Sequence, residues 1–350
     1  MDKKELPKVI VFEGGDVCGK TTQLENIAKR FRENGQKVYT YKFPAKYLHF
    51  NISRDGKNLL TDKYISIIKS LISQNVIKYE NYGGAGVLNI YSIFDALHKY
   101  LFNSSISDII DNWELIKKLI ISDILLNGIN KFLWIAIVYN DMVKRKPDSI
   151  ILIDRFMESG NIYNEILPRT YLREKFKYCE NLDDQKFFNK IIEKDLIIFK
   201  SLSDKVSNVL DASINMINKN EELDVSEFKK GLTDKNYQWV RPNVYKNFVT
   251  LMFASSSYLY NEFKSNINNA NREVSQYDTN EVLKQIVSNV FNDRVISISR
   301  GPSLYILYNT HKINTDLMIS YYRSFYNGNK SCIDFCTDIL MEKISLYNFD

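Results

Sequence analysis

Apolar runs and helical spacings alternate along the chain. Val9–Phe12 is a short run of mostly β-branched apolar residues, which predicts a strand buried on both faces of a sheet. After it, apolar residues recur at helical spacing and predict an amphipathic helix; these are Leu24, Ile27, Ala28 and Phe31. This order of elements favours an α/β fold with a parallel sheet.

Four more strands are predicted after the first. Three lie at Lys37–Tyr41, Ser149–Asp154 and Asp195–Phe199, and the last lies at either Arg294–Ser299 or Ser303–Tyr308. Each is a short run rich in β-branched or aromatic residues, as expected of strands in such a fold. We therefore expect a five-stranded parallel sheet flanked by helices.

The stretch between the second and third predicted strands is far longer than a crossover needs. Asn51–Lys131 contains helical patterns at Tyr64–Ile72 and Ile106–Leu126. We interpret it as a helical insertion or an enlarged crossover within a first domain, 1–265. The C-terminal segment, 266–350, either completes the sheet and adds helices or forms an appendage.

Composition narrows the function classes. The chain has 350 residues and a net charge of +5, with basic and acidic residues alternating, which suits small polyanionic ligands and does not require nucleic acid. Its four cysteines are too scattered for a disulfide framework. No targeting segment is visible before the first strand, and the longest apolar run, Phe132–Val138, is too short to span a bilayer. We expect a soluble, intracellular protein with no membrane or nucleic-acid partner. The cytoplasm is the expected location, and the nucleus or the cytoplasm of a virus-infected cell are the alternatives.

A phosphate-binding loop follows the first strand. Residues 14–21 fit the pattern G-x-x-x-x-G-K-[ST] between a strand and a helix. Successive N–H groups of such a loop point at an anion, together with the helix N-terminus. The residues expected to bind ATP are Gly14, Gly15, Asp16, Val17, Cys18, Gly19, Lys20, Thr21 and Thr22. The alternative interpretation is a glycine turn that holds no ligand.

Two side chains of this loop would carry chemistry. Lys20 would neutralise the β- and γ-phosphates of the nucleotide. Thr21 offers a hydroxyl to Mg²⁺, which prefers oxygen ligands and normally keeps several waters and phosphate oxygens in its shell. ATP and Mg²⁺ are therefore the expected cofactors.

A second motif lies at the end of the strand predicted at Ser149–Asp154, where Arg155 directly follows Asp154. A carboxylate at the carboxyl end of a parallel strand lies at the ligand-binding edge of the sheet, where it can hold the metal or its waters. The planar guanidinium of Arg155 can bind phosphate. Lys20, Asp154 and Arg155 are thus the expected catalytic residues, and Thr21 and Asp154 the expected metal ligands. The alternative is that Asp154 caps the next helix and Arg155 is a surface partner.

Together these motifs resemble those of the thymidylate kinase family. The first family motif, F-E-G-x-D-x-x-G-K-[ST]-T-Q, is matched at 12–23. The second, D-R-[YF]-x-x-S-x-x-A-Y-Q, is matched at Asp154, Arg155, Phe156, Ser159 and Tyr163. The third, F-P-x-R, is partly met by Phe43, Pro44 and Lys46. The resemblance is to a divergent and enlarged member, and it leaves the long insertion and the C-terminal segment unexplained.

The resemblance implies a P-loop kinase fold and transfer of the ATP γ-phosphoryl group to a deoxynucleoside monophosphate, with dTMP as the leading acceptor, in nucleotide biosynthesis. Because the acceptor phosphate is already an anion, catalysis is mostly positioning and charge neutralisation. Nucleotides are the implied partners. Family members commonly form dimers, so a homodimer is one expected assembly.

The family's substrate residues carry over by position. Asp16 is expected to bond the sugar 3′-hydroxyl, Arg155 to bind the acceptor phosphate with help from Lys46, and Tyr163 to pack against the sugar. The complete expected substrate site is Asp16, Phe43, Lys46, Arg155, Ser159 and Tyr163.

The sequence also departs from the family pattern. Val17 stands where many members have arginine, and the lid region offers Lys229, Lys230, Lys235 and Arg241. The segment expected to read the base contains Phe132, Trp134 and Tyr139 but no arginine at a suitable position. The acceptor base is therefore left open by the sequence.

Two rival functions follow from these departures. One is a weak or inactive paralogue that serves as a nucleotide-binding structural or interaction protein. The other is a deoxynucleoside kinase, which would need a carboxylate base near the sugar hydroxyl, with Glu13 or Asp16 in that role.

Overall fold

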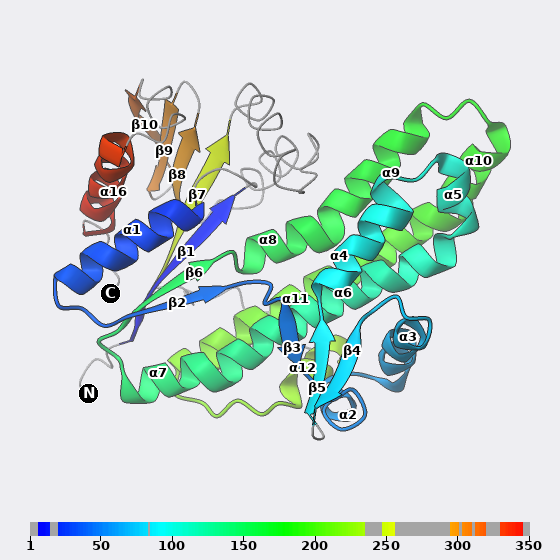
Figure 1. Cartoon of the computed structure of the whole chain (residues 1–350), viewed down its shortest axis with the longest axis horizontal. Helices are drawn as coiled ribbons and strands as arrows, with labels where there is room; N and C mark the ends of the chain where they lie inside the picture. The colour runs from blue at the N-terminus through cyan, green and yellow to red at the C-terminus, as the bar shows by residue number, and fades with distance from the viewer. Residues whose placement is uncertain are drawn as a thin grey trace. The chain divides into compact units, whose positions relative to one another are not determined.

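The chain is a mixed α/β protein that divides into two units, as a computed structural model shows (Figure 1). The structure describes residues 6–14, 20–82, 85–234, 247–255, 295–300, 303–309, 312–319 and 330–345. Unit 1 comprises Met1–Phe43, Asp141–Ser159 and Asn243–Asp350, and unit 2 comprises Pro44–Asn140 and Gly160–Pro242.

Unit 1 contains a seven-stranded sheet in the order β10-β9-β8-β7-β1-β6-β2. Its strands are β1 (Lys8–Gly14), β2 (Val38–Lys42), β6 (Ile150–Asp154), β7 (Phe248–Ser255), β8 (Val295–Arg300), β9 (Ser303–Asn309) and β10 (Lys312–Ile319). Neighbours from β2 to β8 pair in parallel, whereas β9 and β10 add antiparallel pairs. The expected five strands are therefore too few, because both candidates for the last strand form strands and β10 follows them.

One predicted strand is wrong. Asp195–Phe199 lies in the helix α11 (Glu193–Asn218). β1 pairs with β6 on one side, and the strand that pairs with it on the other side is β7. The run looked like a strand because Ile197 and Ile198 are apolar, yet both are exposed. Helical periodicity is visible only over a longer window. The buried residues of α11 that reveal it include Leu196, Phe199, Leu202, Val206, Val209 and Leu210.

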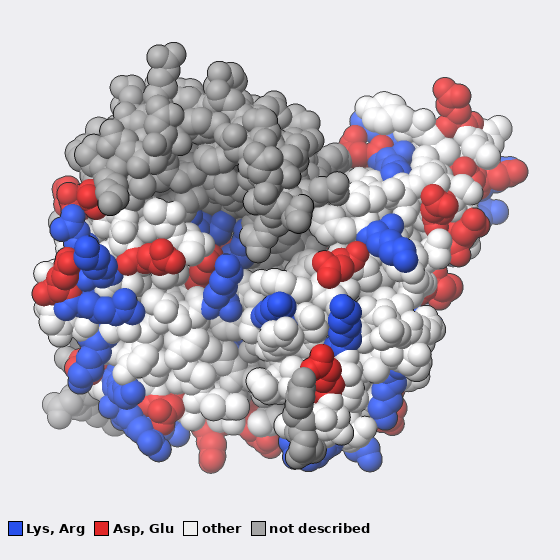
Figure 2. All heavy atoms as spheres, in the orientation of Figure 1, with Lys and Arg blue, Asp and Glu red and all other residues white. Residues whose placement is uncertain are grey.

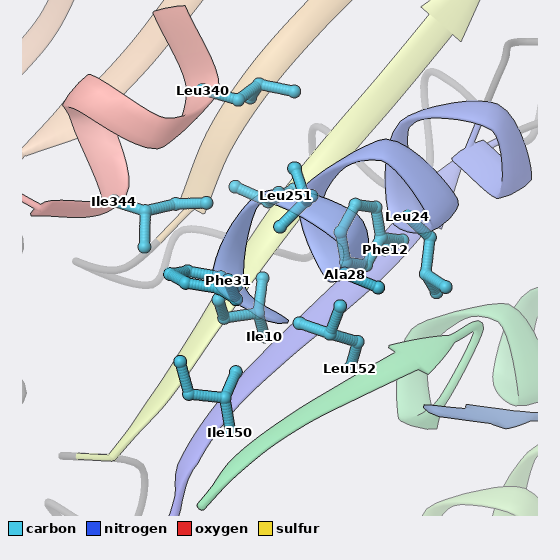
Figure 3. Close-up of a cluster of buried hydrophobic side chains, with 11 residues drawn as sticks. Ile10, Phe12, Leu24, Ala28, Phe31, Ile150, Leu152, Leu251, Leu340 and Ile344 are labelled. Carbon is cyan, nitrogen blue, oxygen red and sulfur yellow. The ribbon is translucent and has the colours of Figure 1, made fainter. Parts of the chain in front are cut away.

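Helices α1 (Lys20–Glu33) and α16 (Lys330–Ser345) pack on one face of this sheet (Figure 3). Side chains alternate along a strand, so Ile10 and Phe12 of β1 point to the same face. They join one buried cluster with Leu24, Ile27, Ala28, Phe31, Ile150, Leu152, Leu251, Leu340 and Ile344. The Thr337 hydroxyl of α16 also donates a hydrogen bond to Gln23 of α1 (2.9 Å). The C-terminal helix thus stabilises the helix that begins at Lys20.

Unit 2 is mainly helical. Its helices and π-helical segments (η) are α2 (Gly56–Leu59), α3 (Asp62–Ser73), α4 (Tyr91–Leu97), η1 (His98–Phe102), α5 (Ile106–Asp111), α6 (Trp113–Leu133), η2 (Trp134–Tyr139), η3 (Ile162–Ile166), α9 (Leu167–Lys177), α10 (Leu182–Phe187), η4 (Phe188–Ile192), α11 and α12 (Glu227–Thr233). Two short helices, α7 (Asn140–Arg145) and α8 (Met157–Asn161), lie at boundaries of the two units.

The long insertion contains the two predicted helical patterns and a small sheet. Tyr64–Ile72 lies within α3, and Ile106–Leu126 is divided into α5 and α6 at Asn112, whose side-chain amide donates to the Asp108 carbonyl (2.8 Å). The strands β3 (Tyr47–His49), β4 (Tyr79–Tyr82) and β5 (Ala85–Asn89) form an antiparallel sheet in the order β3-β5-β4.

The helical stretch Trp113–Arg145 is long and apolar enough to cross a membrane, and it is the one such helix among the described residues. Most of its apolar part is buried inside the protein. Such burial is consistent with the core helix of a soluble protein.

Charges of both signs are intermingled on the described part of the face shown in Figure 2. In unit 2, opposite charges pair along or between helices, as in Lys200–Asp204 (2.6 Å) and Arg173–Glu193 (2.9 Å). The alternation of charge along the sequence thus reappears as neighbouring opposite charges in the folded protein.

Asp123 on α6 is a buried acid. It is fully buried, and its Oδ1 accepts a hydrogen bond from Asn127 Nδ2 (2.7 Å), while Oδ2 has no hydrogen-bond partner within the described part of the chain. Burial raises the pKa of Asp123 to about 7, and the positive charge of Lys131 opposes this rise. The folded protein therefore disfavours the ionised carboxylate at this position.

We expect Asp123→Asn to change how the stability of the protein depends on pH. Below about pH 4 the carboxyl group is protonated in both the folded and the unfolded chain. As the pH rises from there to about 7, ionisation is favoured in the unfolded chain, so the wild type loses about 4 kcal/mol of stability. The variant has no carboxyl at this position and avoids that loss. Denaturant unfolding of both proteins at about pH 5 and about pH 8 measures the difference. An identical pH dependence for the two would contradict the raised pKa.

Candidate functional site

The candidate site lies at one edge of the unit 1 sheet. β1 and β6 pair in parallel with Phe12 opposite Asp154, so their carboxyl ends meet at the same edge. The predicted phosphate loop leaves β1 at Gly14, and α1 begins at Lys20. Residues 15–19 of this loop, which include Asp16 and Val17, lie outside the described residues.

The structure joins two of the predicted site residues directly. Thr21 Oγ1 donates a hydrogen bond to Asp154 Oδ2 (2.8 Å). Asp154 is only 4% exposed, and its other oxygen, Oδ1, is buried without a hydrogen-bond partner in the described part of the structure. Lys20, next to Thr21 in sequence, is 5% exposed. A buried carboxylate, a buried ammonium group and the hydroxyl of the exposed Thr21 therefore lie at the start of α1.

These oxygen atoms suit Mg²⁺. A buried carboxylate oxygen without a partner lowers stability by at least about 1–3 kcal/mol, so binding of a cation or a hydrogen-bond donor at Asp154 Oδ1 would be favourable. The Thr21 hydroxyl donates its hydrogen to Asp154 and keeps lone pairs that can bind a cation. The described residues contain no group of three or more His, Cys, Asp or Glu side chains that could hold a metal. An ion at this site would take its other ligands from phosphate and water, as Mg²⁺ does.

Arg155 directly follows this carboxylate and has an unusual backbone. Its φ angle is +64°, in the left-handed region that non-glycine residues rarely adopt. Its N–H donates to the Phe12 carbonyl of β1 (2.9 Å), and its Nη1 donates to the Ser159 hydroxyl (3.4 Å). Strained residues of this kind concentrate at functional sites, where the surrounding structure holds them in place.

Glu13 links β1 to the segment after Arg155 by two hydrogen bonds. It is fully buried, its Oε1 accepts from the Phe156 N–H (2.7 Å), and its Oε2 accepts from the Ser159 hydroxyl. The sequence indicates Glu13 only as a residue of the first family motif and as the base that a deoxynucleoside kinase would need. A carboxylate at the end of an apolar buried strand must find hydrogen-bond donors, and this signal could have identified its role.

Phe156 is buried between two other rings. Its centroid lies 5.5 Å from that of Phe43, which follows β2, and 6.4 Å from that of Phe248 at the start of β7. The Phe43 N–H donates to the Asp154 carbonyl (2.9 Å). Phe43, predicted to bind substrate, thus supports the backbone of the motif that contains Asp154.

The predicted substrate residues within the described part of the chain belong to both units. Phe43, Arg155 and Ser159 belong to unit 1 and lie in one network. Lys46 and Tyr163 belong to unit 2. Lys46 is exposed with its Nζ 5.2 Å from the ring centroid of Tyr47, and Tyr163 is half-buried in η3.

Two of the lid candidates have contacts within unit 2. Lys229 Nζ donates to the Lys57 carbonyl (3.0 Å), and Lys230 pairs with Glu227 (3.2 Å). Lys235 and Arg241 lie outside the described residues. The described part of the lid region therefore contains lysines whose ammonium groups already contact the protein.

The aromatic residues expected to read the base lie in the core of unit 2. Phe132 packs against Phe228 with centroids 5.2 Å apart, and Trp134 stacks on Tyr139 at 5.8 Å. The Tyr139 hydroxyl donates to Asn218 Oδ1 (2.8 Å). These contacts give all three rings a structural role.

Comparisons with models of known protein families and with curated proteins find no match. The function of the chain must therefore be inferred from its own motifs and their geometry.

We expect Thr21→Val to lower the free energy of unfolding by about 1 kcal/mol in the absence of nucleotide, because it removes the hydrogen bond to Asp154 and keeps the shape of the side chain. Thr22→Val is the matched control, since Thr22 is the next residue on the same turn of α1 and, like Thr21, is exposed. Denaturant unfolding compares the two variants with the wild type. Equal losses in both variants would contradict a stabilising bond between Thr21 and Asp154.

Proposed function

We propose that this chain is a magnesium-dependent kinase that transfers the γ-phosphoryl group of ATP to the phosphate of a deoxynucleoside monophosphate, with dTMP as the leading acceptor, in nucleotide biosynthesis. The observation that carries this proposal is the Thr21–Asp154 hydrogen bond, which links the phosphate-loop motif to the second motif beside a carboxylate oxygen that has no partner among the described residues. Arg155 follows directly and supplies a phosphate-binding group at the same edge of the sheet.

The donor side of the proposed reaction is the start of α1. The N-terminus of this helix and the Lys20 ammonium group would neutralise the phosphates of ATP. Thr21 and Asp154 would hold Mg²⁺, which, when bound, offsets charge on the β- and γ-phosphates. Because Lys20 and Asp154 are largely buried, their charges would act with little screening by water.

The acceptor side of the proposed reaction depends on Arg155. Its guanidinium would hold the acceptor phosphate by charge-assisted hydrogen bonds. An oxygen of that phosphate would attack the γ-phosphorus, and the bond between this phosphorus and the β–γ bridging oxygen would break, leaving ADP. The attacking oxygen is already anionic at neutral pH, so no general base is needed.

The proposal includes a P-loop kinase fold. It is supported by a strand, phosphate-loop motif and helix in sequence, with the strand paired in parallel on both sides. We also propose a soluble, intracellular location and a homodimer, on the basis of the sequence and the family resemblance.

The environment of Glu13 disfavours a deoxynucleoside kinase in which Glu13 is the catalytic base. That enzyme needs a carboxylate free to take a proton from a sugar hydroxyl. Both oxygens of Glu13 already accept hydrogen bonds, and the residue is fully buried. The inactive rival is disfavoured by the intact set of Lys20, Thr21, Asp154 and Arg155, since binding alone does not require all four.

We expect ADP release from MgATP in the presence of dTMP, and its loss when the metal is chelated. Assays with each deoxynucleoside monophosphate and with thymidine would define the acceptor. Arg155→Lys should raise the KM for the acceptor by about 10- to 100-fold with a smaller effect on the KM for ATP, because lysine loses the two-pronged contact with phosphate.

Lys20→Ala is the background control, and it should lower kcat by at least about 100-fold. Arg169→Lys is a matched control for Arg155→Lys, since Arg169 pairs with Glu165 within unit 2, and it should leave the acceptor KM unchanged. ATP binding without turnover on any acceptor would contradict the proposed function and favour the inactive rival. Turnover with thymidine alone would favour the deoxynucleoside kinase.

A further inference from the structure

The left-handed backbone of Arg155 needs a cause. This conformation costs about 1–2 kcal/mol for a residue with a Cβ atom, so other contacts must hold it. The amide groups on both sides of the Arg155 α-carbon are hydrogen-bonded to consecutive residues of β1. Arg155 N–H donates to the Phe12 carbonyl (2.9 Å), and Phe156 N–H donates to Glu13 Oε1 (2.7 Å). Phe12 accepts through its backbone carbonyl, whereas Glu13 accepts through its side-chain carboxylate.

The second oxygen of Glu13 acts on the Arg155 side chain through Ser159. The Ser159 hydroxyl donates its hydrogen to Glu13 Oε2, so only its lone pairs face other groups. Arg155 Nη1 uses one of them (3.4 Å). Since guanidinium groups only donate, the Glu13 carboxylate keeps the Ser159 hydroxyl in the orientation that can accept from Arg155.

Burial makes this arrangement hard to replace. Glu13 is 0% exposed and Ser159 is 4% exposed, so water does not easily substitute for a lost partner. The rings of Phe43 and Phe248 flank Phe156 and fix the residue that donates to Glu13. The Glu13 carboxylate thus fixes both the backbone conformation of Arg155 and the position of its side chain.

We propose that Glu13 is a positioning residue that holds Arg155 in the conformation needed to bind the acceptor phosphate. This inference rests on the proposed function, in which Arg155 contacts that phosphate. Glu13 does not touch the reacting atoms. Glu13 acts on the geometry of the Arg155 guanidinium, so its loss should weaken acceptor binding much more than ATP binding.

Glu13→Gln is the decisive variant, because it keeps the size of the side chain and removes one acceptor. Its amide NH₂ must face either the Phe156 N–H or the Ser159 hydroxyl. In the first case two donors face each other. In the second, the hydroxyl turns its hydrogen away from residue 13 and toward Arg155. We expect the KM for dTMP to rise about 10- to 100-fold, while the KM for ATP changes less than about threefold.

Ser159→Ala separates the two arms of the network. It removes the link to the Arg155 side chain and leaves the Phe156 N–H bonded to Glu13, so the KM for dTMP should rise by a smaller factor. When Glu13→Gln is added to Ser159→Ala, it should raise the KM for dTMP by a smaller factor than it does in the wild type. The reason is that the link from Glu13 to Arg155 through Ser159 is already absent. If Glu13→Gln fails to fold, Ser159→Ala alone carries the test, and an unchanged KM for dTMP would overturn the inference.

Asp195→Asn is a matched control for the loss of a buried carboxylate. Asp195 is 6% exposed, accepts from Trp113 Nε1 (2.9 Å) and pairs with Lys117 (3.1 Å) in unit 2. It should lower stability without a selective rise in the KM for dTMP. Equal rises in this variant and in Glu13→Gln would overturn the positioning role and indicate a general loss of stability.

A crystal structure of Glu13→Gln provides a readout that does not depend on activity. We expect Arg155 to leave the left-handed region or its guanidinium to leave Ser159. An unchanged Arg155 in this structure would overturn the inference even if the wild type is an active kinase. Conversely, a wild type without turnover on any acceptor would refute the proposed function, whereas a displaced Arg155 would still establish the structural effect of Glu13.

Discussion

The parallel pairing of β1 with β6 is the interaction on which the rest of the site depends. It sets Phe12 opposite Asp154, so the loop that leaves β1 and the acid that ends β6 reach the same edge of the sheet. Every contact of the site follows from this register. Thr21 reaches Asp154, Arg155 donates back to Phe12, and the residue after it donates to Glu13. A shift of β6 by one residue would turn the Asp154 side chain to the other face of the sheet.

The polar groups of the site interact strongly because most of them are buried. Glu13, Lys20, Asp154 and Ser159 are all at least nine-tenths buried. In such surroundings a satisfied hydrogen bond fixes geometry, whereas an unsatisfied group is costly. Glu13 is an example of the first case, and Asp154 Oδ1, which has no hydrogen-bond partner in the part of the chain that the structure describes, is an example of the second. In the proposed kinase these two conditions have different uses, since one carboxylate holds the protein in place and the other is available to a metal.

Sequence reasoning succeeded where short motifs and regular spacing coincide. The strand before the predicted phosphate loop, the helix after it and the strand that ends in Asp154 were all predicted. It failed at Asp195–Phe199, where two exposed isoleucines imitate a buried strand within a long helix. It also missed β7, although Phe248–Ser255 is an apolar run of the kind expected in a parallel sheet. The contact between Glu13 and Ser159 could not be predicted from spacing, because it joins residues 146 positions apart.

The most direct test of the central claim is a crystal structure of the protein with ADP, Mg²⁺ and dTMP. The proposed function requires the phosphates of ADP at the start of α1, Mg²⁺ held by Thr21 and by Asp154 directly or through water, and the phosphate of dTMP at Arg155. Nucleotide phosphates bound elsewhere, or a metal that contacts neither Thr21 nor Asp154, would contradict this assignment of the site.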